Sequence, residues 1–221
     1  MKKLNVINGL LIFISLSMLC SLLTTSLTAF NLSGTAKKDA YFLAFEIILG
    51  LGLVFLPSLI AKKKRFVIPE MLYLFYLLFI YGSVYLGTVN HFYSYIKYWD
   101  KGLHLISGPL VSAFGLSVLT FLVDAKVIQK LTSVFVFLYG VAFSVLGGVL
   151  WEFYEFTCDS FGMNLQRYMK SGKPLLGRAA LLDTMGDLWM DFLGAVLFML
   201  FVAWKLKKNH NWLEKFSFHK I

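Results

Sequence analysis

Apolar and polar stretches alternate along the whole chain. Six apolar stretches are long, at about 4–29, 41–60, 67–89, 102–123, 131–151 and 184–204. Because a helix needs about 20 apolar residues to cross a bilayer, the pattern predicts six transmembrane helices. A membrane β-barrel would show short segments of alternating hydrophobicity instead. We therefore expect an all-α, polytopic membrane protein.

The composition supports this interpretation. Hydrophobic residues make up 58% of the 221 residues and charged residues 15%, whereas soluble domains average about half apolar and about a quarter charged. No internal repeat, low-complexity tract or soluble domain interrupts the pattern. We expect one transmembrane domain over 1–221, with a basic tail at 205–221.

The first apolar stretch has a second interpretation, because Lys2 and Lys3 before an apolar run are also typical of a secretory signal peptide. The run is longer than the core of a signal peptide, and no small-residue cleavage site follows it. Leu19 also stands before Cys20, where a lipoprotein signal would have a small residue. We expect a retained helix.

The basic residues indicate the orientation. With the N-terminus inside, thirteen of the 21 Lys and Arg residues fall on the cytoplasmic side and eight outside, as the positive-inside rule favours. The C-terminus is then cytoplasmic as well. The net charge of +9 is spread over membrane-flanking clusters and forms no single patch, which argues against nucleic-acid binding.

Seven of the twelve acidic residues, with one histidine, gather at the ends of the last three apolar stretches, all on the predicted outer side. They form three groups along the chain: Asp100 and His104; Glu152, Glu155 and Asp159; and Asp183, Asp187 and Asp191. Within each group the spacing is three or four residues, so each group lines one face of a helix.

Two simpler explanations compete for parts of this cluster. Interfacial acids can be merely solvated, and Asp183 can serve as the N-cap of a helix that begins at Thr184. Neither explains the full set, because ionisable groups inside a membrane usually face the bundle interior and are functional. Neighbouring carboxylates cannot all ionise, so shared protons or a bound cation must stabilise the cluster.

Carboxylate oxygens suit hard divalent ions such as Mg²⁺, Mn²⁺ or Ca²⁺, and a histidine also admits Zn²⁺. We expect one such cation. The candidate ligands are Asp100, His104, Glu155, Asp183, Asp187 and Asp191. Glu152 or His104 is the candidate general base. In the long loop before the last helix, Arg167 and Arg178 are candidates for holding an anionic lipid headgroup, since Arg binds phosphate in a bidentate way.

Several glycines near the cluster have a structural interpretation. Small residues let membrane helices approach closely, and we expect this role for Gly108, Gly115, Gly147, Gly148 and Gly194.

Three motifs within about 98–200 resemble a known family. The stretch Asp100-Lys-Gly-Leu-His104 with Gly108 is similar to the D-[KR]-x-x-H-x-x-x-G motif of YjdF-like bacterial inner-membrane proteins. Trp151-Glu152-Phe-Tyr-Glu155-Phe resembles their Y-E-x-x-E-W, and Asp183-Thr-Met-Gly-Asp187 with Gly194-Ala195 resembles D-T-x-x-D followed by G-A. A fainter similarity runs to VanZ-like proteins, in which Asn stands at the position of Asp191.

The resemblance implies a multi-pass protein of the bacterial cytoplasmic membrane in a poorly characterised family. VanZ-like membership would imply a connection to the cell envelope. Three functions stay open: a metal-dependent enzyme that acts on a lipid or lipid-linked envelope substrate, an ion- or proton-coupled transporter that uses the carboxylates, and a structural membrane scaffold. Membrane lipids are the expected partners in each case.

Overall fold

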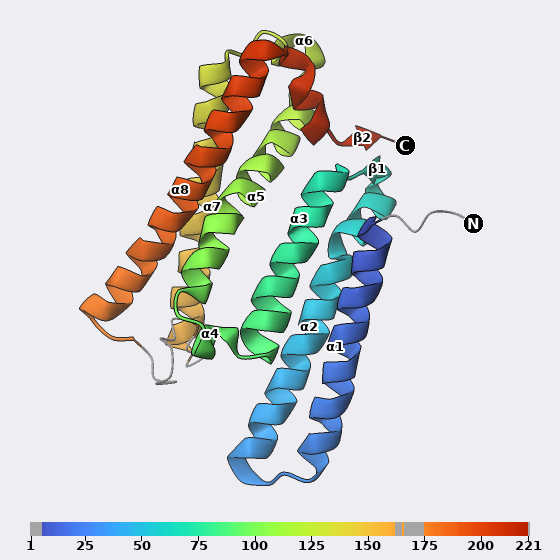
Figure 1. Cartoon of the computed structure of the whole chain (residues 1–221), viewed down its shortest axis with the longest axis vertical. Helices are drawn as coiled ribbons and strands as arrows, with labels where there is room; N and C mark the ends of the chain where they lie inside the picture. The colour runs from blue at the N-terminus through green and yellow to red at the C-terminus, as the bar shows by residue number, and fades with distance from the viewer. Residues whose placement is uncertain (1–5, 162–164, 166–174, 221) are drawn as a thin grey trace. The chain divides into compact units, whose positions relative to one another are not determined.

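The computed structural model describes residues 6–161, 165 and 175–220 and is predominantly helical (Figure 1). The elements in chain order are α1 (Val6–Phe30), α2 (Gly34–Lys64), β1 (Phe66–Val67), α3 (Glu70–Ile80), η1 (Tyr81–Val89), α4 (Phe92–Tyr95), α5 (Trp99–Leu122), α6 (Ala125–Ile128), α7 (Ser133–Ser160), α8 (Arg178–Lys208), η2 (His210–Phe216) and β2 (His219–Lys220).

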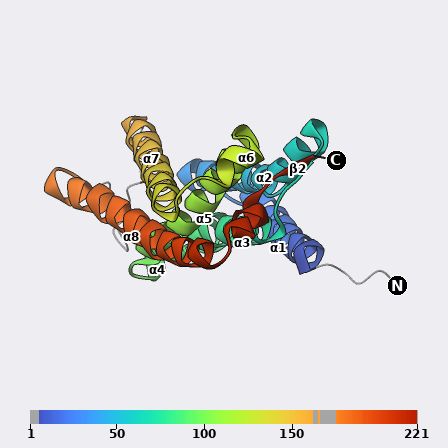
Figure 2. The same ribbon diagram turned by 90° about the horizontal axis from the view of Figure 1, so that it is seen from above.

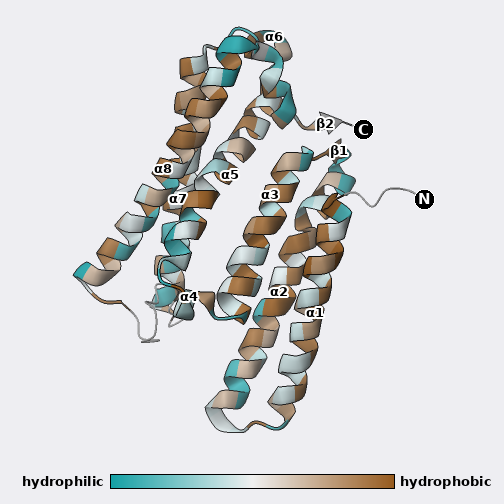
Figure 3. Cartoon of the chain, viewed as in Figure 1, coloured by the Kyte–Doolittle hydropathy of each residue, from teal (hydrophilic) through white to brown (hydrophobic). Residues whose placement is uncertain are grey.

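The prediction of six spans is confirmed. Six helical stretches are long and apolar enough to cross a membrane: α1, α2, α3 with η1, α5, α7 and α8. Figure 3 shows apolar residues along most of the helix shafts and hydrophilic residues concentrated toward helix ends and connections. The chain is therefore a multi-pass membrane protein.

The helix ends differ from the predicted ones, and in α7 and α8 the difference bears on the site. α7 continues past 151 to Ser160, and α8 begins at Arg178, before 184. The apolar stretch marks the part of a helix that needs lipid, whereas backbone hydrogen bonding continues through polar turns on either side. The acidic groups thus lie within the helices themselves.

The chain divides into two compact units, one of described residues up to Phe92 with Lys220 and one of Tyr93–His219. The single domain expected over 1–221 stays a prediction. In the first unit, α1, α2 and α3 pack around a core that includes Ile14, Met18, Ile47 and Leu77. Arg65 follows the end of α2 as its C-cap and adopts a left-handed conformation with φ 55°, after three lysines in the last turn.

The second unit is a bundle of α5, α7 and α8, seen from the side in Figure 1 and from above in Figure 2. The short helix α6 lies in the connection between α5 and α7, and η2 packs against α5 and α8. Toward the end of the bundle at which α8 finishes, the core consists of Leu116, Val136, Met199, Val202, Leu206 and Leu213.

Close helix approach holds this bundle together near its middle. A Cβ on Gly108 of α5 would lie 2.2 Å from the carbonyl oxygen of Asp191, and one on Gly194 of α8 would lie 2.2 Å from the carbonyl oxygen of Leu105. The two helices therefore touch backbone to backbone. This confirms the packing role predicted for these two glycines.

Two serines join α5 to α7 at the same depth. The Ser112 hydroxyl donates to the carbonyl oxygen of Gly140 at 3.1 Å, and the Ser144 hydroxyl donates to that of Gly108 at 3.0 Å. Both side chains are buried, so each bond satisfies a polar group that would otherwise be costly in the apolar interior. The bundle below the polar cluster is thus fixed on two sides of α5.

Candidate site at the polar end of the α5, α7 and α8 bundle

The three acidic groups come together at one end of the second unit. α5 begins there, α7 ends there and α8 begins there. The side chains of His104, Glu152, Glu155, Asp187 and Asp191 are buried, and none is more than 9% exposed. Ionisable groups at this depth require partners, and the contacts among them define the site.

Lys101 binds the acids of α8. Its ammonium group donates to Asp187 Oδ2 at 2.6 Å, to Asp183 Oδ1 at 2.7 Å and to the carbonyl oxygen of Asp183 at 3.0 Å. Asp100 Oδ2 is 3.9 Å away. Lys101 therefore ties the first turn of α5 to the second and third turns of α8 and offsets part of the acidic charge.

Asp191 holds the His104 ring at its Nδ1 atom. Nδ1 lies 3.0 Å from Asp191 Oδ2, and the other carboxylate oxygen of Asp191 accepts a hydrogen bond from the Ser107 hydroxyl. In the neutral ring, an acid at Nδ1 favours the tautomer with the proton on that nitrogen, and Nε2 then carries the lone pair. The ring is thereby oriented so that Nε2 faces the acids at the helix ends.

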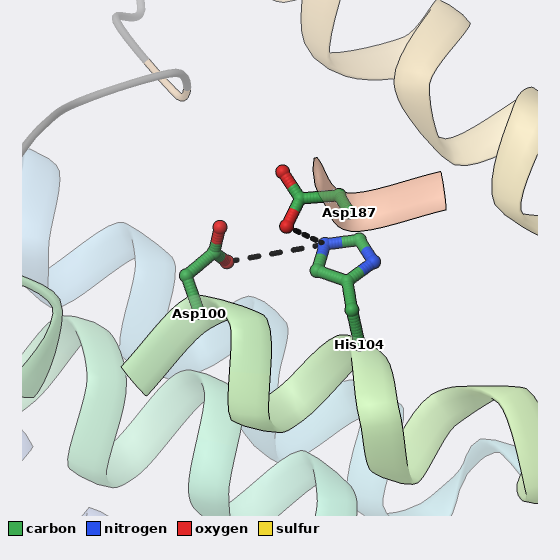
Figure 4. A group of neighbouring side chains, drawn as sticks. All are labelled: Asp100, His104 and Asp187. Carbon is green, nitrogen blue, oxygen red and sulfur yellow. Dashed lines mark ion pairs between the residues drawn. The ribbon is translucent and has the colours of Figure 1, made fainter. Parts of the chain in front are cut away.

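Three potential ligand atoms converge on the other side of the ring (Figure 4). His104 Nε2 lies 3.7 Å from Asp187 Oδ1 and 3.9 Å from Asp100 Oδ1. One ligand atom each from Asp100, His104 and Asp187 lies within 4.8 Å of the other two. Asp187 is fully buried, and its Oδ1 makes no hydrogen bond within the described residues. This oxygen is available to a ligand.

α7 contributes two glutamates beside this group. Glu155 Oε1 accepts a hydrogen bond from the Trp151 indole at 2.9 Å. Both carboxylate oxygens of Glu152 are buried without a hydrogen bond in the described part of the chain, although Thr184 of α8 faces them. Glu152 interacts electrostatically with His104 and Asp100. It is therefore a second unsatisfied carboxyl group that faces the site.

Tyr93, in the short helix α4 outside the spans, also faces the cluster. Burial and the negative charge of Asp100, Glu155 and Asp187 raise the pKa of its phenol above the usual range. The hydroxyl thus keeps its proton at neutral pH and stays available as a hydrogen-bond donor.

Two glycines, one in α7 and one in α8, make room for the charged groups. A Cβ on Gly148 of α7 would lie 2.6 Å from Asp191 Oδ2, and one on Gly186 of α8 would lie 3.2 Å from Cε of Lys101. The absence of side chains at these positions lets Asp191 and Lys101 enter the helix interfaces. For Gly148, this confirms the predicted packing role.

Acidic charge exceeds basic charge in the cluster. Two basic side chains, Lys101 and His104, pair with its acids. The carboxyl groups number six: Asp100, Glu152, Glu155, Asp183, Asp187 and Asp191. Carboxylates this close cannot all be charged unless a cation or protons compensate them.

The remaining sequence-based candidates lie elsewhere. Asp159, in the last turn of α7, accepts a hydrogen bond at Oδ1 from the backbone N–H of Leu165 in the loop that follows. The alternative that Asp183 caps a helix is wrong, because α8 begins at Arg178 with Gly177 in the N-cap position. Arg178 is exposed at this helix start. Arg167 lies outside the described residues.

Two members of the site, Lys101 and Tyr93, are not among the candidates predicted from the sequence. Lys101 is one of the eight basic residues predicted on the outer side, although the family motif carries Lys or Arg directly after its first aspartate. Helical phase gives no signal for either, since Lys101 reaches the acids through a long side chain and Tyr93 lies on a separate short helix.

Fold and site together define a class: a polytopic α-helical membrane protein with a buried acid, lysine and histidine cluster at one end of a three-helix bundle. The chain belongs to the family described as predicted membrane protein (DUF2238), whose model matches residues 18–208. The resemblance to YjdF-like proteins is consistent with this family. Comparison with curated proteins and with solved structures finds no match.

Proposed function

We propose that the polar end of the α5, α7 and α8 bundle binds one divalent cation, and that the protein is a metal-dependent enzyme. Its substrate would be a lipid or a lipid-linked component of the cell envelope. We place it in the bacterial cytoplasmic membrane, with both termini inside and the site facing outward, as the distribution of basic residues favours.

One observation carries the proposal: Asp187 Oδ1 is buried and makes no hydrogen bond within the described residues, and it lies 3.7 Å from His104 Nε2, which is 3.9 Å from Asp100 Oδ1. A buried carboxylate oxygen without a hydrogen bond is destabilising by about 1–3 kcal/mol or more. A cation between the three atoms would remove that cost, and Mg²⁺, Mn²⁺, Ca²⁺ and Zn²⁺ all accept carboxylate oxygen ligands.

The contacts distinguish the roles of the candidate ligands. Asp100, His104 and Asp187 have atoms that face one another, so we assign them as the ligands. Asp191 holds the far side of the imidazole, an arrangement that orients histidine ligands in many metal sites. Asp183 is bound to Lys101, and Glu155 to Trp151, which leaves each as an outer partner.

Three protein ligands leave coordination positions open for water or substrate, as in catalytic metal sites. A cation there would polarise a phosphoryl or carbonyl group or activate water. Since His104 serves as a ligand, Glu152 is the better candidate for general base, because its buried oxygens are unsatisfied. Arg178 and Arg167 keep their proposed role with an anionic headgroup, supported by the exposure of Arg178 at the start of α8.

Metal analysis of the purified protein tests the proposal. After equilibration with Mn²⁺ and removal of the free ion, elemental analysis should find about one Mn²⁺ per chain. Asp187→Asn and His104→Ala should each lose it. Asp39→Asn, which changes an exposed acid of α2, is the matched control and should retain it. A wild-type protein without bound Mn²⁺, Mg²⁺, Ca²⁺ or Zn²⁺ would contradict the proposal.

A scaffold function has one specific observation in its favour: Lys101 and His104 tie α5 to α8 through ion pairs with Asp187 and Asp191. A scaffold predicts that Asp187→Asn lowers the thermal stability of the detergent-solubilised protein even when metal is removed beforehand. The metal site predicts instead that added Mn²⁺ raises the melting temperature of the wild type and leaves that of Asp187→Asn unchanged.

A transporter function finds less support. Beyond Asp191, the described stretches of the three helices toward their other ends carry no charged side chain until the basic residues that follow 204, so no charged path continues through the bundle. Cation flux into proteoliposomes that disappears in Asp187→Asn would favour this function over the enzyme.

A further inference from the structure

Lys101 occupies a position that resembles a cation site. An ammonium group has three N–H donors, and all three point at oxygen atoms: Asp187 Oδ2, Asp183 Oδ1 and the carbonyl oxygen of Asp183, at 2.6–3.0 Å. These are carboxylate and carbonyl oxygens, the donors that bind hard metal cations. With every donor engaged, Lys101 has none left for an anionic substrate.

Asp187 connects this position to the proposed metal site. One of its oxygens, Oδ2, binds the ammonium group of Lys101, while the other, Oδ1, faces His104 Nε2 at 3.7 Å. A single carboxylate therefore lies between two positions that suit cations. Enzymes with two metal ions hold them about 3.5–4 Å apart, a separation that a shared carboxylate can span.

We propose that Lys101 fills the second cation position of a site otherwise built for two metal ions, and so limits the protein to one divalent cation. The inference rests on the proposed function in one respect, since the first position is the site formed by Asp100, His104 and Asp187. The ammonium group reserves Asp183 and one oxygen of Asp187, and leaves Asp187 Oδ1 to the metal ion.

The surroundings of Lys101 accommodate its side chain and hold its ammonium group among the acids. Gly186 gives its side chain room, since a Cβ there would lie 3.2 Å from Lys101 Cε and 3.5 Å from its Nζ. The Lys101 side chain is only 21% exposed, and those of Asp183 and Asp187 are 15% and 1% exposed. The ammonium group of Lys101 is covalently part of the chain, so it cannot dissociate on dilution as a second metal ion can.

The test is the number of Mn²⁺ ions bound to the full-length protein. Lys101→Met removes the positive charge and keeps most of the side-chain volume. Titration followed by electron paramagnetic resonance should show about one Mn²⁺ in the wild type and about two in Lys101→Met, with a spin-coupled spectrum because the two ions would lie a few Å apart. Lys126→Met, an exposed lysine of α6, should bind one.

Asp183 supplies a second, independent variant. Its oxygens serve the second position, so Asp183→Asn in the otherwise wild-type protein should leave one Mn²⁺ bound with little change in affinity. Combined with Lys101→Met, it should return the count from two to one. Because Asp183→Asn keeps Lys101, it also tests the inference if Lys101→Met does not fold.

The outcomes separate the two proposals. One Mn²⁺ in both the wild type and Lys101→Met, with an uncoupled spectrum, overturns the inference and leaves the proposed metal site standing. Loss of Mn²⁺ in Asp183→Asn alone also overturns it, because Asp183 would then bind the first cation. No Mn²⁺ in the wild type overturns both. A merely structural role of Lys101 would lower stability but would not raise the number of bound ions.

Discussion

The residue that best explains the site is His104, because its two ring nitrogens have different tasks. Nδ1 is bound to Asp191, and Nε2 faces Asp187 and Asp100. The acid on one side fixes the ring and its tautomer, so the other nitrogen presents a lone pair to the space between the acids. Asp191 lies deep in α8 because that is where it can hold Nδ1 of His104.

Replacing that acid should weaken metal binding without removing a ligand. Asp191→Asn should lower the Mn²⁺ affinity about 10–100-fold, the usual effect of losing an outer partner of a histidine ligand. Ser107→Ala, which removes the hydroxyl contacts to the other oxygen of Asp191 and to the carbonyl oxygen of His104, should change it far less. Titration with Mn²⁺ measures both, and an unchanged affinity in Asp191→Asn would contradict this role.

For Glu152 we predict that a substitution raises the stability of the protein. Both oxygens of its carboxylate are buried without a hydrogen bond in the part of the chain that the structure describes, and the desolvation of such a group costs about 1–3 kcal/mol or more. Glu152→Met should therefore raise the melting temperature of the metal-free protein in detergent. Glu155→Met should not, because the Trp151 indole would lose its acceptor. A lower melting temperature in Glu152→Met would show that Glu152 is satisfied in the folded protein.

At the scale of elements, the contact between α5 and α8 positions the site. Gly108 and Gly194 bring the two backbones together just below the cluster, and Lys101 and His104 join the helices above that contact. The distances between Asp100, His104 and Asp187 therefore depend on how closely these two helices approach. A small separation of the helices would pull Asp187 away from the other two.

Gly108→Ala tests this dependence. The added methyl group would meet the Asp191 backbone at 2.2 Å, and overpacking of this kind costs about 1–3 kcal/mol. We expect a lower melting temperature in detergent together with weaker Mn²⁺ binding. Gly102→Ala is the matched control on the same helix, because a Cβ there meets nothing within 4 Å. Equal effects of the two substitutions would contradict the packing argument.

At the scale of the whole molecule, six spans and the distribution of basic residues predict an orientation. An even number of spans places both termini on one side, and the basic residues favour the inside for them. We therefore expect the end of α7 and the start of α8, with the acidic cluster, to face outward. The chain's two cysteines, Cys20 in α1 and Cys158 near the end of α7, are both free.

Cys158 allows a direct test of this orientation. In a Cys20→Ser variant, a membrane-impermeant maleimide added to intact cells should label Cys158, which is partly exposed near the end of α7. Cys20→Ser combined with Cys158→Ser is the unlabelled control. Labelling that requires permeabilised cells would reverse the orientation and place the site on the cytoplasmic side.

The sequence by itself determined the number of membrane-spanning stretches and the faces that carry the acids. Transfer of apolar side chains into lipid is a local property, so hydropathy locates each span. Spacing along a helix is also local, and it places Asp183, Asp187 and Asp191 on one face. Backbone hydrogen bonding continues beyond the apolar stretches, so hydropathy placed the end of α7 and the start of α8 wrongly.

Only the tertiary structure decided which groups meet. The distances that pair Lys101 with Asp187, and His104 with Asp191, depend on the depth and rotation of α5 relative to α8, and neither quantity is encoded in the periodicity of a single helix. Glycine contacts between distant segments set both. For that reason the sequence placed Lys101 among the outer basic residues, whereas the packed bundle makes it the cation at the centre of the acidic cluster.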